Sequence, residues 1–270
     1  YFHTGVKINE SDLIYLHDDI NNVYKQYYDT DTNILNTEIT NTYFNLKILQ
    51  TDFVAIKEDI LVKKYIFINE SNIPLDVRFL IHSELLSDIN NYVGCKIVDG
   101  GMTQYAHDFT FSTFAKGKNI IKHQINGSKE TIKRTEIYDK DYIGMSKDSS
   151  ISFDLGVIPA GTKKCIDINI IIDESNNTMN DFIDEIERIR KIDLNKEYAD
   201  TVEIVRYYAN ANGHGLWCTR LFNPLVWLGS FFLTPICKMF ANQYYEQDLT
   251  TYDFDYQLVS FEDSLKRIKL

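Results

Sequence analysis

The side chains in this 270-residue chain that could do chemistry show none of the spacings that mark a metal, nucleophile or nucleotide site. The six histidines include neither an H-E-x-x-H motif nor an H-x-H pair, so we expect no metal site. His107-Asp108 could begin a nucleophile relay, but no G-x-S-x-G elbow accompanies it. The glycines form no nucleotide-binding loop, and we expect no cofactor.

The carboxylates are the next candidates, because general acid–base catalysis needs two of them facing one bond. Asp18 and Asp19 are neighbours at the end of an alternating segment, where adjacent side chains point to opposite faces. We therefore expect a solvated turn there. Glu84 has an apolar setting that could raise its pKa, with a salt-bridged or rim carboxylate as the alternative. The sequence predicts no catalytic residue.

Aromatic residues gather near the start of the chain. Sugars stack their C–H faces on flat rings, and a Tyr hydroxyl can orient them. A Tyr-rich loop leaving a β-sandwich could contact a glucan or dock against another domain. The alternative is that the rings fill the core or its edge. The candidate contact residues are Tyr24, Tyr27, Tyr28, Tyr43 and Phe44.

The elements that must position these residues are predicted to be β-strands. Residues 13–54 alternate apolar with polar side chains and contain no Pro or Gly, which favours long antiparallel strands with one buried face. We expect strands over 12–18, 34–54 and 60–68. The turn at 69–74 predicts a hairpin between the last of these and the segment that follows it.

Further strands are predicted beyond residue 90. Glycines separate short strands over 93–125, and 128–148 should be a long connection with little regular structure. Residues 150–173 predict a second hairpin with its turn at 159–162. Regular strand–turn spacing of this kind is typical of a β-sandwich.

The pattern becomes helical after residue 175. Apolar residues at helical spacing predict one helix over 179–192, and a second is expected over about 195–209. Residues 221–241 are apolar for long enough to cross a bilayer, but Pro224 and Pro235 interrupt them and no basic cluster flanks them. We expect a buried helix pair or a partner-docking segment there. The predicted domains are 1–175, a sandwich; 176–209, a helical linker; and 210–270, an apolar C-terminal segment.

Composition excludes some partners. The net charge of -11 argues against nucleic acid and against an anionic membrane surface. A hydrophobic fraction of 44% is ample for a sizeable core. The four cysteines are widely spaced without metal-ligand neighbours, which favours a reducing, cytoplasmic compartment.

Several segments resemble the N-terminal β-sandwich domain of the bacterial glucoamylase-type glycoside hydrolases, glycoside hydrolase family 15. The similarity covers roughly residues 1–205. Its recognisable pieces are FHTGVKIN at 2–9, LHDDINNVYKQYY at 16–28, LNTEITNTYFNL at 35–46, DKDYIGMSKDSSISFDLG at 139–156 and IDEIERIRKID at 183–193. The resemblance implies that the chain begins inside the domain, after its opening strands.

The resemblance implies an accessory role. In that family a helical linker joins the sandwich to a separate (α/α)₆ barrel, which hydrolyses terminal α-glucosidic bonds with inversion through two Glu carboxylates. No part of the barrel is recognisable in 210–270, and neither Glu maps onto this chain. We therefore expect a mainly β, supersandwich-like domain that is inactive alone, with the barrel of the same parent protein and an α-glucan as partners.

Two alternatives remain open at this stage. The chain could be a stand-alone carbohydrate-binding or structural β-sandwich with no enzymatic role. Residues 210–270 could also come from a truncated or frameshifted reading frame, or form a membrane-associated tail.

Overall fold

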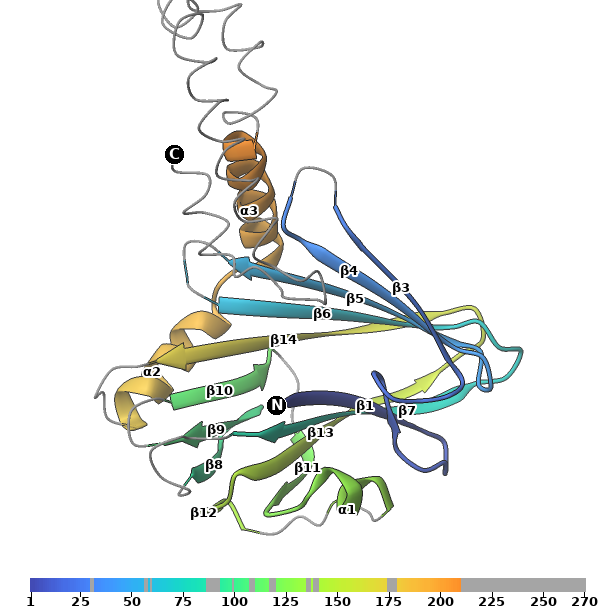
Figure 1. The fold of residues 1–270 in the computed structure, drawn as a ribbon, viewed down its shortest axis with the longest axis horizontal. Helices are drawn as coiled ribbons and strands as arrows, with labels where there is room; N and C mark the ends of the chain where they lie inside the picture. Colours follow the sequence, from blue (N-terminus) through green and yellow to red (C-terminus); the bar gives the residue numbers. More distant parts are fainter. Residues whose placement is uncertain are drawn as a thin grey trace, which may run out of the picture. The chain divides into compact units, whose positions relative to one another are not determined.

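The computed structural model describes residues 1–29, 32–55, 58, 60–85, 93–98, 100–106, 110–116, 120–134, 137, 141–173 and 179–209. Within these ranges the chain is mainly β and forms two antiparallel sheets that face each other (Figure 1). The predicted fold class is confirmed for this part of the chain. Residues 210–270, and with them the apolar run 221–241, lie outside the described residues, as does His107.

The smaller sheet has five strands in the described residues. Their order is β11 (Ile120–Ile125), β13 (Asp148–Ile158), β7 (Leu75–Glu84), β1 (Phe2–Ile8) and β2 (Ile14–Tyr15). The larger sheet has nine. Their order is β12 (Ile143–Met145), β8 (Gly94–Val98), β9 (Gly101–Tyr105), β10 (Thr110–Ala115), β14 (Lys163–Asp173), β6 (Ile60–Asn69), β5 (Leu46–Ala55), β4 (Leu35–Asn41) and β3 (Asn22–Tyr28).

The core lies between the sheets and follows the predicted alternation of the strands. Every second residue of β1 and β7 faces the larger sheet, because successive strand side chains point to opposite faces. Aromatic rings fill the centre: Phe79 of β7 lies 4.8 Å from Tyr65 and 5.5 Å from Phe67 between ring centroids. These contacts fix the two sheets face to face.

Helical segments cover the outer faces of the sandwich. Helix α2 (Met179–Arg190) and the start of α3 (Leu194–Ala209) pack on the larger sheet, where the Arg190 guanidinium lies 5.7 Å from the Phe114 ring centre. The Phe53 and Tyr198 rings meet edge to face at 5.2 Å. The short helix α1 (Lys129–Arg134) forms a small cluster with Tyr15 and Leu80 on the smaller sheet.

The chain divides into two compact units. Residues 1–28 with 34–198 form the first, and residues 29–33 with 199–270 the second. Helix α2 and the start of α3 thus belong to the first unit, while the predicted domain boundary near residue 175 stays a prediction. Among the helices that the structure describes, none is long and apolar enough to cross a membrane.

Both predicted hairpins are wrong in their pairing, although their strands and turns are placed correctly. Strand β6 pairs with β5 and β14, whereas β7 pairs with β1 and β13 in the other sheet. The turn at 159–162 likewise leads from β13 in the smaller sheet to β14 in the larger one. The two connections are therefore crossings between the layers. Alternation along a strand indicates which face is buried but not which strand lies beside it.

Other expectations are corrected in detail. The predicted strand 34–54 is two strands, β4 and β5, joined by a turn in which Asn45 has φ 52°. Asn tolerates this left-handed conformation better than most residues, and the sequence offered no Gly or Pro to mark the turn. Of the segment 12–18 only Ile14–Tyr15 is a strand, and the connection 128–148 contains α1 and β12.

One buried asparagine links the two layer crossings. The Asn69 amide nitrogen donates to the carbonyls of Ile73, at 2.7 Å, and Ile158, at 2.8 Å. Its side-chain oxygen accepts from the main-chain N–H of Ser71 at 2.9 Å. Its own main-chain N–H donates to the Thr162 carbonyl at 3.0 Å. Asn69 is fully buried, so these bonds replace water at both crossings.

Candidate functional site

Three connections meet at one end of the sandwich and expose large apolar side chains. The main-chain N–H of Thr42 donates to the Asn21 carbonyl, and that of Glu70 donates to the Asn45 carbonyl, both at 2.9 Å. These bonds join the loop 17–21, the turn 42–45 and the turn 70–74. The exposed side chains are Ile20 (98%), Tyr43 (73%) and Ile73 (60%), which we call the turn-end patch. Grouped exposed apolar side chains are typical of an interaction surface.

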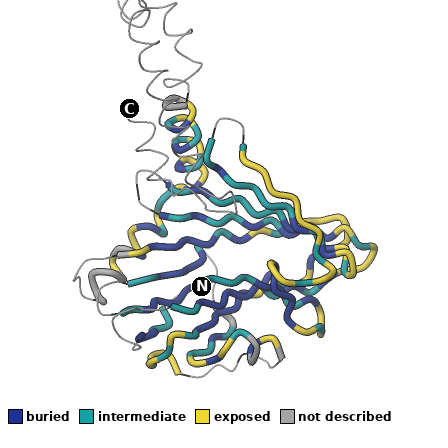
Figure 2. Tube along the Cα trace, viewed as in Figure 1, coloured by how far each residue is buried: buried dark blue, intermediate teal, exposed yellow. Residues whose placement is uncertain are grey.

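The predicted aromatic residues do not form one cluster. Tyr24, Tyr27 and Tyr28 lie on the edge strand β3, which is exposed along most of its length (Figure 2), and their rings do not fill the core. Tyr43 is exposed in its turn, and Phe44 beside it packs partly against the core. The four tyrosines therefore do not fill the core, although three of them lie on an edge strand, whereas Phe44 packs against the core.

The alternation of β3 also separates its rings. Tyr24 and Tyr28 share one face, and Tyr27 lies on the other. Four residues of strand span roughly 13 Å, so one sugar ring cannot stack on both Tyr24 and Tyr28. The Tyr24 hydroxyl donates to the Leu16 carbonyl at 2.7 Å, and the Lys25 ammonium lies 5.1 Å from the centre of the Tyr27 ring. A platform for sugars would therefore consist of separate rings.

A cluster that the sequence did not predict lies on the outer face of the smaller sheet. The His3 and His17 rings stack with centroids 4.6 Å apart, and His82 lies 6.1 Å from His3. The Lys129 ammonium is 2.8 Å from His17 Nε2 and 4.9 Å from the centre of the Tyr15 ring. Burial, followed by the positive charge of Lys129, lowers the pKa of His3 and of His17. The stack therefore favours neutral imidazoles.

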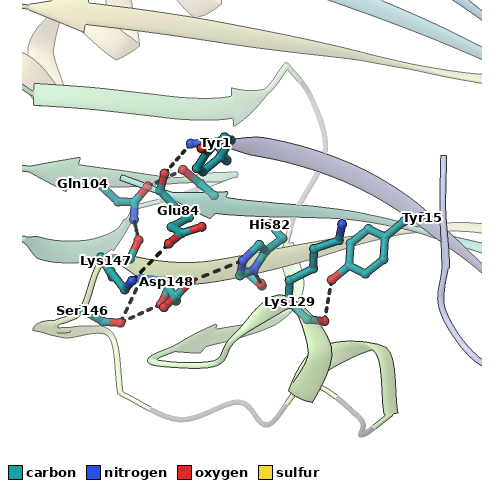
Figure 3. A network of polar contacts seen from close by, with 11 residues as sticks. Tyr1, Tyr15, His82, Glu84, Gln104, Lys129, Ser146, Lys147 and Asp148 are labelled. Atoms are coloured by element: carbon teal, nitrogen blue, oxygen red, sulfur yellow. Dashed lines mark hydrogen bonds and ion pairs between the residues drawn. The ribbon is translucent and has the colours of Figure 1, made fainter. Parts of the chain in front are cut away.

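His82 and Asp148 belong to the polar network of Figure 3, and with Ser150 they form a Ser-His-Asp set. Its Nδ1 lies 2.8 Å from Ser150 Oγ, and its Nε2 lies 3.6 Å from Asp148 Oδ1. Ser150 is fully buried and His82 is 1% exposed, so no substrate reaches the hydroxyl. A nucleophile must contact its substrate, and this set is therefore structural.

Two of the carboxylates weighed in the sequence, Glu84 and Asp19, are partly exposed and hydrogen-bonded. Glu84 pairs with the Lys147 ammonium at 3.1 Å, which confirms the salt-bridged alternative (Figure 3). The Asp19 carboxylate accepts the main-chain N–H of Asn21 at 2.8 Å, in the solvated turn that was predicted. Among the residues that the structure describes, no three potential metal ligands gather at one point.

No protein-family profile matches the chain, and no curated protein matches it either. Solved structures do match its fold. A bacterial glucoamylase complexed with acarbose matches over 81% of this chain and 32% of its own, with 11% sequence identity and a TM-score of 0.59. A protein assigned as a kojibiose phosphorylase from the human microbiome matches over 77% of this chain and 27% of its own, with 16% identity and a TM-score of 0.53.

The comparisons establish a shared fold. The sandwich of this chain is one that occurs within a glycoside hydrolase and within a protein assigned as a phosphorylase of a sugar. The chain spans about a third of the length of either structure.

Proposed function

We propose that this chain is the accessory β-sandwich of a glucoamylase-like enzyme that acts on α-glucans, with the catalytic groups on a separate barrel domain of the same parent protein. The observation that carries the proposal is the match over most of this chain but about a third of the glucoamylase.

The turn-end patch is the surface that we assign to the barrel. Ile20, Tyr43 and Ile73 lie on three connections that hydrogen-bond to one another, so they can be covered together. Covering exposed apolar side chains yields roughly 25 cal/mol for each Å² removed from water. If the barrel packs on this patch, the sandwich would gain stability. The barrel loops that touch the patch would then be held in place.

The DNA that flanks this coding segment provides the first test. We expect the reading frame to continue into a helical domain that carries paired glutamates. That domain, produced separately, should bind this chain in calorimetry, and Tyr43→Ser with Ile20→Ser should weaken binding at least tenfold. The exposed Tyr1→Ser serves as the control, since Tyr1 lies outside the patch. Stop codons on both sides, or specific glucose release from malto-oligosaccharides by this chain alone, would refute the proposal.

A second candidate function is a carbohydrate-binding module, which the exposed rings of β3 favour. It predicts retarded migration in a native gel that contains soluble glucan, lost when Tyr24, Tyr27 and Tyr28 become Ala. Unretarded migration of the natural chain removes this candidate.

A further inference from the structure

Strand β3 leaves one edge of the larger sheet free of any described strand. It is the last strand in the sheet order, and β4 is its neighbour on one side. Its residues from Val23 to Tyr28 are all exposed (Figure 2). Natural edge strands are protected by Pro, bulges, charges or short length. β3 has seven residues, one charge (Lys25), no Pro and an unbroken register with β4.

The hydrogen bonds beside β3 show which main-chain groups face its free edge. The N–H of Thr42 donates to the carbonyl of Asn21, so odd-numbered residues of this strand bond to β4. The N–H of Asn22 instead donates to Asp19, away from β4. Because direction alternates along an antiparallel ladder, Tyr24, Gln26 and Tyr28 present their N–H and carbonyl groups outward.

The sequence of β3 is complementary to itself in one antiparallel register. If Gln26 lies opposite Gln26 of a second copy, Tyr24 faces Tyr28 and Lys25 faces Tyr27. The outward groups of residues 24, 26 and 28 then form the hydrogen-bonded pairs. Residues 25 and 27 form the closer, non-hydrogen-bonded pairs. Lys25 already lies over the Tyr27 ring of its own chain, so cation–π attraction is available to this pair.

We propose that β3 pairs with β3 of a second copy of this chain, which joins two of the larger sheets across a two-fold axis. Such an interface is isologous, since each copy contributes the same strand. A glucan would use the rings but leave the outward N–H and carbonyl groups of Tyr24, Gln26 and Tyr28 to water. A second strand would contact the rings and would also hydrogen-bond to these main-chain groups. This difference favours self-pairing. The inference is independent of the proposed function and uses different residues from the turn-end patch.

Analytical ultracentrifugation of the full chain tests the pairing. An interface made by two seven-residue strands is small and is expected to be weak. The chain concentration is therefore varied from roughly 1 µM to roughly 500 µM. We expect the natural chain to change from monomer to dimer as its concentration rises. Gln26→Pro should remain monomeric, because proline removes an outward N–H while leaving the bonds to β4 intact. Gln26→Ala is the matched control: both variants lose the 2.9 Å bond from Gln26 Nε2 to Thr37, but Ala keeps the N–H and should dimerise.

A cross-linking experiment fixes the register without relying on the fold of the proline variant. Under oxidation, a mixture of Lys25→Cys and Tyr27→Cys chains should form a disulfide between positions 25 and 27. Either variant alone should form none between its new cysteines. Peptide mass spectrometry separates this linkage from those of the native cysteines. A natural chain that stays monomeric throughout, an unchanged dimer in Gln26→Pro, or equal cross-linking of 25 with 25 would each overturn the proposal. Monomers retarded by glucan would assign the β3 rings to sugar instead.

Discussion

Asn69 hydrogen-bonds to two of the layer crossings, the one that follows β6 and the one that follows β13. Replacing it by Ala removes the bonds to Ile73 and Ser71 and leaves the Ile158 carbonyl without its side-chain donor. Each such loss costs about 1 kcal/mol, and more where a group stays buried and unpaired, so we expect unfolding to become easier by roughly 3 kcal/mol. Urea unfolding measures this. The exposed Asn72→Ala should change stability little, and equal effects of the two would contradict this role.

His3 and His17 give stability a pH dependence. Their pKa values are lowered in the folded chain, whereas the unfolded chain has the ordinary value of 6.5. The unfolded chain therefore binds more protons as the pH falls. The stabilisation is complete above pH 6.5 and is lost below it, towards the lowered folded pKa values. The urea midpoint should decrease from about pH 7 to about pH 5. The double variant His3→Asn, His17→Asn should show a flatter profile; identical profiles would contradict this assignment.

Cys95 and Cys165 should differ in reactivity. Cys95 is fully buried, and burial raises the pKa of its thiol to about 11, whereas Cys165 is exposed. The thiolate is the reactive form, so iodoacetamide at pH 8 should label Cys165 and spare Cys95 until urea is added. Peptide mass spectrometry gives the labelled fraction at each position. Rapid native labelling of Cys95 would show that the core opens readily.

At the scale of strands and helices, the sequence predicted which face of a strand is buried better than it predicted which strands pair with each other. Alternating residues located β5, β6, β7, β13 and β14 because a half-buried strand leaves that pattern in its side chains. The pairing of β6 with β14 joins residues about a hundred positions apart, and that of β7 with β13 joins residues 64 to 83 positions apart. Nothing local in the sequence encodes such a choice, since it is made by the packing of the whole core.

The histidine cluster was beyond prediction for the same reason. His3 and His82 become neighbours only through the register of β1 with β7, and His17 reaches them from a loop. The aromatic residues were found because they are close in sequence, yet their exposure depends on β3 being an edge strand. A local segment of sequence shows where aromatic residues are grouped. Their exposure to solvent depends on the position of that segment in the sheet.

Close packing of β9 against β10 can be tested at Gly101. A Cβ atom there would lie 2.4 Å from the Thr113 carbonyl oxygen and 2.4 Å from Phe114 Cβ, so main chain must move to admit it. Gly101→Ala should lower the free energy of unfolding by about 2 kcal/mol. At Gly144 the nearest atom is a side-chain methyl of Ile125 at 3.2 Å, and Gly144→Ala should cost less. Calorimetric or urea unfolding compares the two, and the reverse order would contradict the described packing.

At the scale of the molecule, α2 and the start of α3 complete the sandwich as well as extending it. Ile186, Ile189 and Leu194 are buried, and the Lys64 ammonium donates to Asn195 at 2.9 Å. A chain that ends at residue 175 would uncover Phe53 and Phe114 on the larger sheet. We expect it to aggregate or unfold, whereas a chain that ends at residue 209 should keep a cooperative transition. Equal stability by circular dichroism and light scattering would instead make the helices a simple linker.

The layer crossings also restrict how this fold can change over evolution. The chain passes from one sheet to the other after β2, β6, β7, β10, β11, β12 and β13, so neither sheet is a continuous piece of sequence. A gene segment that encoded one sheet alone does not exist, and neither layer can be deleted, duplicated or exchanged in a single recombination event. The run from β3 to β6 is different, because residues 22–69 form four consecutive neighbouring strands. Insertion or loss of whole strands is therefore expected in that run, at the margin of the larger sheet.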